Sequence, residues 1–215
     1  MHRGTVEAIA AQKRALRAGI RASRAIRAAL PADDPARLAE GRALARAVLE
    51  GAAAAVARAA DDGTPVCSYE SLPSEPPTRE LHEELAARGL TVLVPLLLPD
   101  KDLDWIRWLP RDHSEHGEHG ETPPLGPNTI GRARLIVVPA LAVDGAGTRL
   151  GQGGGSYDRA LARRHPQSRV VALIDAEPSA QLPTLPHDQA VDAVASATGG
   201  WRDVGLHRAP GGAPP

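Results

Sequence analysis

The sequence predicts a single α/β domain of three layers, in which helices cover both faces of a mostly parallel sheet. Short apolar segments alternate with segments of helical composition, and this order is typical of parallel strands joined by helices. Residues 90–98 and 135–143 are nearly uninterrupted apolar runs, as expected of strands buried on both faces. The length of 215 residues fits one domain of ordinary size.

The helices are predicted from composition and from the residues that end them. The predicted helices cover residues 5–30, 36–60, 78–88 and 157–164. The first is rich in Ala, Leu and Arg, which favour helices, and it contains no proline before Pro31. Thr78 stands where a helix cap is expected, and Gly89 is typical of a residue that ends a helix.

The strands alternate with these helices. The predicted strands are residues 66–69, 90–98, 104–109, 135–143, 169–174 and 190–195, and a long polar loop is expected at 111–129. We therefore expect one domain over residues 1–201. Residues 202–215 are rich in Gly and Pro and predict a disordered tail.

Composition excludes several classes of protein. The net charge of −1 gives no long-range field for nucleic acid, so no nucleic-acid partner is expected. One cysteine, Cys67, rules out an internal disulfide, and its apolar surroundings favour a buried small side chain over a nucleophile. No apolar run approaches the length of a membrane span, so we expect a cytoplasmic protein without a membrane partner, and a monomer.

A glycine-rich loop carries the strongest functional signal. It reads Arg-Leu-Gly-Gln-Gly-Gly-Gly-Ser-Tyr-Asp over residues 149–158 and leads into a predicted helix. Glycines let the backbone approach a ligand closely, amides at a helix start attract anions, and Arg149 adds a cationic fork suited to phosphate. No Gly-Lys-Ser/Thr follows, and Ser156 stands where a dinucleotide fingerprint needs its third glycine. The pattern favours a phosphate site over a flexible surface loop.

This loop, with the preceding Val-Val-Pro-Ala-Leu-Ala-Val-Asp, resembles the signature of the 5-formyltetrahydrofolate cyclo-ligase family. The resemblance extends from Lys13 to about Val194. It implies a fold like that of the NagB/RpiA/CoA-transferase group. It also implies a ligase that uses ATP to convert 5-formyltetrahydrofolate into 5,10-methenyltetrahydrofolate, with release of ADP and phosphate.

The resemblance also assigns roles to residues. Arg149 and Tyr157 are the expected catalytic residues, and Glu75 and Ser156 are expected to bind the folate. The two carboxylates expected to hold Mg²⁺, which suits hard oxygen ligands, are Asp158 and Asp192. The residues expected to bind ATP are Lys13, Arg17, Arg149, Gly151, Gly153, Gly154, Gly155, Ser156 and Tyr157.

Taken without the resemblance, several of these residues have simpler interpretations. Lys13, Arg17, Arg21 and Arg24 lie at helical spacing, and such a stripe is usually a solvated helix face. A lone Glu75 before a helix would be read as an exposed carboxylate. Three histidines at 113, 116 and 119 alternate with glycines, which favours a solvated loop over a metal site.

Two other functions remain open on the sequence. Ser156 stands where the family usually has Tyr, and Pro76-Pro77 follows Glu75, so a related ATP-dependent enzyme could act on another small formyl or amide compound. Alternatively, the same fold could serve as a non-catalytic module that binds RNA through its Arg-rich first helix. Salt-sensitive RNA binding without ATP turnover would distinguish that module.

Overall fold

The computed structural model describes residues 3–110, 123–175 and 177–205 as an α/β domain with a seven-stranded main sheet. The order across that sheet is β3-β2-β1-β4-β7-β8-β9. Pairings among β2, β1, β4, β7 and β8 are parallel, while β3 and β9 pair antiparallel at the two edges. The strands are β1 (Val66–Cys67), β2 (Val92–Leu97), β3 (Leu103–Arg107), β4 (Leu135–Pro139), β7 (Arg169–Leu173), β8 (Ala193–Ser196) and β9 (Gly200–Asp203).

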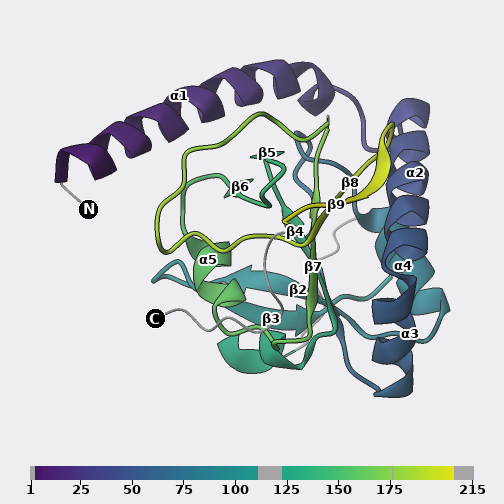
Figure 1. Ribbon diagram of the computed structural model, residues 1–215. Helices are drawn as coiled ribbons and strands as arrows, with labels where there is room; N and C mark the ends of the chain where they lie inside the picture. Colours follow the sequence, from purple (N-terminus) through teal and green to yellow (C-terminus); the bar gives the residue numbers. More distant parts are fainter. Residues whose placement is uncertain (1–2, 111–122, 176, 206–215) are drawn as a thin grey trace.

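Helices cover both faces of this sheet, which confirms the predicted three layers (Figure 1). On one face α2 and α4 bury Leu44, Val48 and Leu85 against the strands. The short helix α3 directly follows α2 along the chain. On the other face α5 and η1 bury Leu161 and Ile130. The helical elements are α1 (Arg3–Ala28), α2 (Pro35–Gly51), α3 (Ala53–Asp61), α4 (Arg79–Ala87), η1 (Pro127–Arg132) and α5 (Ser156–Leu161).

The helix α1 lies across the carboxyl ends of the central strands instead of packing on a sheet face (Figure 1). Arg24 donates from Nη2 to the carbonyl of Ala140, just after β4, over 2.8 Å. Its Nε also pairs with the carboxylate of Asp175, just after β7, over 2.5 Å, and Arg27 contacts the same carboxylate. These ion pairs anchor the carboxyl-terminal half of α1 at the edge of the sheet where ligands of α/β proteins bind.

Two predicted elements are divided in the structure. The helix expected at 36–60 is interrupted at Ala52, beside the point where the Trp201 ring packs against Gly51 so closely that a Cβ would lie 2.0 Å from it. The strand expected at 135–143 ends at Pro139, which has no amide hydrogen for the ladder. The chain then leaves the main sheet and forms a small antiparallel pair of β5 (Ala142–Val143) and β6 (Arg149–Leu150).

The burial expected for residues 90–98 is only half correct. Val92, Leu93 and Val94 are buried, but Leu96 and Leu97 are exposed by 40% and 64%. The reason is that β1 has only two residues, and within β2 it pairs with Val92 and Leu93 alone. In the described part of the chain, the second half of β2 therefore has a strand partner on one side only, which is β3.

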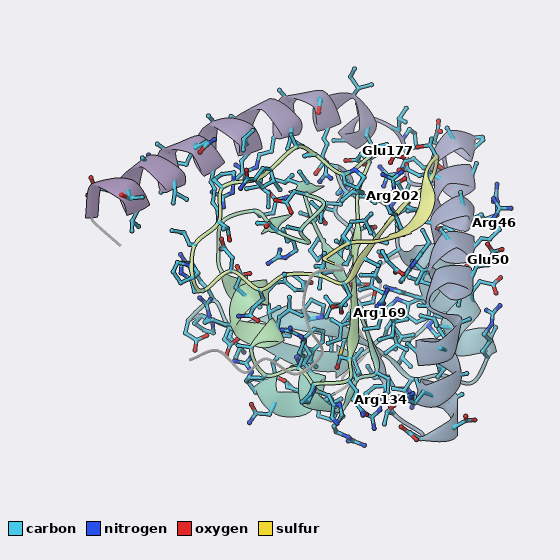
Figure 2. All side chains as sticks on the ribbon, viewed as in Figure 1. Arg46, Glu50, Arg134, Arg169, Glu177 and Arg202 are labelled. Carbon is cyan, nitrogen blue, oxygen red and sulfur yellow. The ribbon has the colours of Figure 1, made fainter. Side chains whose placement is uncertain are left out.

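The ordered chain extends past the domain end expected at residue 201. Arg202 and Asp203 belong to β9, Val204 is buried, and Arg202 forms an ion pair with Glu177 over 2.6 Å (Figure 2). The remaining tail and the histidines at 113, 116 and 119 lie outside the described residues. Among the helices that are described, none has the length and apolar character needed to cross a membrane. Cys67 is buried, as expected.

His82 of α4 is a buried titratable group beneath the sheet. Its Nε2 lies 2.7 Å from the hydroxyl of Ser68, and its ring packs edge-on against Trp108 at 5.2 Å between centroids. Burial lowers the pKa of His82 to about 3 from its ordinary value of 6.5. The folded protein therefore holds a neutral imidazole where the unfolded chain binds a proton.

This difference predicts that the protein loses stability as pH falls below about 6.5. Between pH 7.5 and 5.0, proton uptake by the unfolded chain at this histidine should remove about 2 kcal/mol of the free energy of unfolding. Urea unfolding at the two pH values measures the loss. His82→Gln keeps a hydrogen-bonding side chain but does not titrate, so its loss over the same range should be smaller. Equal losses in both proteins would contradict the assignment.

Candidate functional site

A cleft of about 720 Å³ opens between α1 and the carboxyl ends of β1 and β4. Its size is that of an ordinary small-molecule site, and its position is where parallel sheets bind ligands. Four segments meet there: the basic face of α1, the loop after β1 that carries Glu75, the glycine-rich loop after β6, and residues 185–188. The sequence-predicted site residues all line this cleft except Asp192.

The glycine-rich loop has the backbone geometry that its composition predicts. Gly153 and Gly155 have φ values of 105° and 73°, in the region that favours glycine. Gly155 caps the start of α5, so the loop leads directly into that helix with Ser156 at its first position. At Gly151 a Cβ would lie 2.5 Å from Nη1 of Arg149, so this glycine leaves the space that the guanidinium occupies.

Arg149 is the central cation of the cleft. Its side chain is almost fully buried, its Nη2 pairs with Asp158 over 2.9 Å, and its guanidinium lies 5.7 Å from the centre of the Tyr157 ring. The Nε of Arg149 is buried with no hydrogen-bond partner within the described residues. A buried donor without a partner is costly, which indicates a group kept ready for an anion.

Tyr157 forms part of the cleft wall and packs against both main cores. Burial, with a further contribution from the negative charge of Glu75, raises the pKa of the Tyr157 phenol above its usual range. The hydroxyl therefore stays protonated at neutral pH. It can donate a hydrogen bond but cannot act as a base.

The basic stripe of α1 faces the protein: Lys13 and Arg24 are buried and Arg17 is half-buried, while Arg21 contacts the glycine-rich loop but is exposed. Lys13 is buried and forms an ion pair with Asp188, and Arg17 donates from Nε to the carbonyl of Gly151 over 2.8 Å. Desolvation and the neighbouring charge of Arg21 lower the pKa of Arg17. The stripe has two roles: Lys13, Arg17 and Arg21 contact the cleft segments, whereas Arg24 anchors the helix to Asp175.

Glu75 is buried, contrary to the simple interpretation of an exposed loop carboxylate. Its Oε2 accepts the amide of Leu72 over 3.1 Å, and its Oε1 lies 3.4 Å from Nε2 of Gln152 in the glycine-rich loop. The loop around it is held by Thr78, whose hydroxyl donates to the carbonyl of Tyr69 over 2.7 Å. Thr78 thus stands at the predicted cap position, but its side chain stabilises the Glu75 loop instead of capping α4.

The two predicted metal carboxylates do not lie together. Asp158 lines the cleft, but Asp192 precedes β8 and accepts the amide of Val170 over 2.8 Å. Val170 belongs to the amino end of β7, next to Arg169, and Figure 2 shows that Arg169 and Arg134 lie away from α1. Asp192 therefore lies at the amino ends of the parallel strands, whereas Asp158 lines the cleft at their carboxyl ends.

Asp188 occupies the place in the cleft that Asp192 was expected to take. Burial would raise the pKa of Asp188, but hydrogen bonds from Lys13 and from the Leu185 amide, with the Lys13 charge, lower it overall. Asp188 is therefore ionised beside Lys13. The sequence alone assigns no role to Asp188, and two aspartates four residues apart carry no sequence signal that tells which of them faces the cleft.

Comparisons with known proteins show the family to which the chain belongs. The model of the 5-formyltetrahydrofolate cyclo-ligase family matches residues 9–197. A Mycolicibacterium smegmatis protein named 5-formyltetrahydrofolate cyclo-ligase is 37% identical over 138 residues, which is 60% of this chain and 71% of that protein.

Two solved structures share the fold. One is the 5,10-methenyltetrahydrofolate synthetase of Aquifex aeolicus, with a TM-score of 0.63 and 21% identity over 89% of this chain and 92% of that one. The other is a 5,10-methenyltetrahydrofolate synthetase from Mycoplasma pneumoniae, with a TM-score of 0.61 and 18% identity over 86% and 98%. With nearly the whole described domain matched by the family model, the chain belongs to the 5-formyltetrahydrofolate cyclo-ligase family of enzymes.

Proposed function

We propose that this enzyme uses ATP to cyclise 5-formyltetrahydrofolate to 5,10-methenyltetrahydrofolate, with release of ADP and phosphate. The observation that carries the proposal is the meeting of Arg149 and Lys13 with Glu75 in one cleft. A cationic, glycine-lined side suits a triphosphate, and a carboxylate side suits the amino and amide groups of a pterin. Family membership supports the same substrate class.

The chemistry asks the protein mainly for positioning and charge neutralisation. The formyl oxygen attacks the γ-phosphorus, and the bond to the β-phosphate oxygen breaks, so that ADP leaves. N10 of the folate then attacks the phosphorylated formyl carbon. Phosphate departs with the former formyl oxygen, and loss of the N10 proton leaves the methenyl bridge. Holding the two reactants in contact accounts for much of the acceleration expected in such a reaction.

Three side chains would hold the triphosphate with the loop amides. Arg149 supplies a guanidinium group in the lining of the cleft, Lys13 supplies a buried ammonium group, and Arg17 lies against the loop at Gly151 and Gly153. Tyr157, which stays protonated, would serve as a wall and a hydrogen-bond donor. Negative charge that develops on the transferred phosphoryl group is stabilised by such preorganised donors.

Apolar side chains would support the flat folate beside Glu75. Leu72 and Leu97 line the cleft although they are exposed by 57% and 64%. Large apolar side chains at the mouth of a cleft favour an apolar ligand surface. In this chain, which has no Phe and few other aromatic residues, leucines would take the place of stacking rings.

Mg²⁺ fits the carboxylates of the cleft better than the pair expected from the sequence. Asp158 and Asp188 both line the cleft and offer the hard oxygen ligands that Mg²⁺ prefers, and Asp188 is held ionised. When bound with ATP, Mg²⁺ would neutralise phosphate charge there. The same carboxylates pair with Arg149 and Lys13, so a bound nucleotide and its metal ion would compete for both members of each ion pair.

The direct test mixes the purified protein with Mg-ATP and 5-formyltetrahydrofolate and follows the near-ultraviolet absorbance of the methenyl product. We expect product only when both substrates are present. ATP binding without product would leave the phosphate site intact but exclude this folate as the substrate. Absence of both ATP binding and product would exclude the proposed function.

Arg149→Ala should lower kcat by about 100-fold, because it removes a preorganised donor to the transferred phosphoryl group. Circular dichroism should show a folded protein. Arg134→Ala is the matched control, because Arg134 also pairs with an aspartate, Asp62, but lies at the end of the molecule away from α1 (Figure 2). Turnover near that of the wild type in Arg149→Ala would remove Arg149 from the mechanism.

Asp188→Asn and Asp192→Asn should behave differently although the two residues are four positions apart. The first change removes an ionised cleft carboxylate and should lower kcat about tenfold or more and raise the Mg²⁺ concentration needed for activity. The second retains an oxygen that can accept the Val170 amide, so activity should stay within about twofold. Kinetics over a Mg²⁺ titration distinguish them, and the reverse ranking would restore Asp192 to the metal site.

A further inference from the structure

Gln152 joins the helix α1 to the glutamate of the β1–α4 loop. Arg21 of α1 donates to Oε1 of Gln152 from Nε over 3.1 Å and from Nη2 over 2.9 Å, and Nη2 also reaches the Gln152 carbonyl over 2.9 Å. On its other side, Nε2 of Gln152 donates to Oε1 of Glu75 over 3.4 Å. The side chain therefore bridges a cation and a carboxylate that belong to different segments.

The neighbours of Gln152 fix which end of its amide faces which group. Arg21 has only donors, so the oxygen must face it, and an ionised Glu75 has only acceptors, so the NH₂ group must face that side. The remaining oxygen of Glu75 accepts the Leu72 amide. Both oxygens of Glu75 are thus held in place, one by its own loop and one by the glycine-rich loop.

We propose that Gln152 is a positioning residue for the folate site, which orients Glu75 by donating one neutral hydrogen bond. This inference rests on the proposed function, because it assigns Glu75 to the pterin. The position needs both an acceptor for Arg21 and a donor for Glu75, and a primary amide combines the two. Arg21 is the residue that keeps the amide in the required orientation.

A purely structural role for residue 152 would favour a glutamate at this position instead of a glutamine. If Gln152 served only to tie α1 to the loop, a glutamate would do so better, because an ion pair with Arg21 is stronger than a bond to an amide. If Gln152 positions Glu75, a glutamate brings a second carboxylate to within contact of the first, and like charges destabilise the ionised form of both. Gln152→Glu therefore separates the two roles.

The test measures the KM for 5-formyltetrahydrofolate and for ATP separately in three variants of the full chain. Gln152→Glu should raise the folate KM about tenfold or more, and Gln152→Ala about threefold, since a hydrogen bond to a charged group is lost or replaced by repulsion. Arg21→Ala, which frees the amide to rotate, should raise it about twofold. Because Gln152 lies in the loop whose amides would face the triphosphate, the ATP KM should also rise in Gln152→Glu, but by a smaller factor than the folate KM, since the new carboxylate lies beside Glu75.

A pH series adds a readout that a structural role would not affect. Lowering the pH from 7.5 to 5.5 should protonate the carboxylate pair in Gln152→Glu, restore one donor, and reduce the ratio of its folate KM to that of the wild type. Burial raises the pKa values of Tyr69 and Tyr157 beside Glu75, so both phenols stay neutral over this range. The cleft also contains other ionisable side chains, namely Lys13, Arg14, Arg17, Glu70, Arg149, Asp158, His187 and Asp188, and these are the same in the wild type and the variant, so the KM ratio isolates the change at residue 152.

Controls separate failure of this inference from failure of the proposed function. Gln167→Glu makes the same charge change in the loop before β7, outside the cleft, and should leave both KM values unchanged. A wild-type enzyme without folate-dependent turnover would remove the proposed function itself. An active wild type with an unchanged folate KM in Gln152→Glu, or a KM ratio that does not fall with pH, would overturn the role of Gln152 alone.

Discussion

The ion pairs of Arg24 and Arg27 with Asp175 are the constraint on which the cleft depends. The apolar burial of α1 is small, with Ile20 beside a small cluster around Leu150, so polar contacts hold the helix over the carboxyl ends of the sheet, including the ion pair of Arg27 with Glu40 of α2. With Arg24 almost fully buried, the loss of its partner would leave an unpaired charge in a dry environment, which is strongly destabilising. That cost holds the helix, and so holds Lys13, Arg17 and Arg21 over the glycine-rich loop.

Two buried cations of the cleft each have a carboxylate partner: Lys13 pairs with Asp188, and Arg149 pairs with Asp158. A buried cation with no partner would cost several kcal/mol. The two carboxylates therefore have a structural role, because they stabilise the cations, in addition to the proposed chemical role toward a nucleotide and its metal ion.

Much of the fold could be predicted from the sequence, because strands buried on both faces and helices ended by Pro or Gly leave strong local signals. The alternation around β2, β4 and β7 predicted the parallel sheet, and the glycines at 151–155 predicted the loop that lines the cleft. The break at Ala52 was missed because it lies beside the contact of Gly51 with the distant Trp201. The break after Pro139 was missed because the apolar run continues into β5, although β5 pairs with the nearby β6 and not with the main sheet.

The candidate site was predictable where a residue type and a local pattern coincide, and not where the choice depends on packing. Arg149 and the glycines fall in the first class. Asp188 and Asp192 fall in the second, because both are aspartates near a strand start and only the fold shows which one faces the cleft. The contacts of Gln152 with Arg21 and Glu75 could not be predicted from the sequence either, since these two partners are 131 and 77 residues away along the chain.

The brevity of β1 has a consequence for the cost of binding. After the last backbone bond to β2, which the Ser68 amide donates to Leu93, the chain from Tyr69 to Thr78 is shaped by bonds within the loop, from Tyr69 to Pro76, from Leu72 to Glu75 and from Thr78 to Tyr69. Ordering a loop when a ligand arrives consumes conformational entropy, and a loop already fixed by internal bonds has little left to lose. The Glu75 side chain on this loop would therefore lose little conformational entropy when a ligand binds, so more of the interaction energy would contribute to affinity.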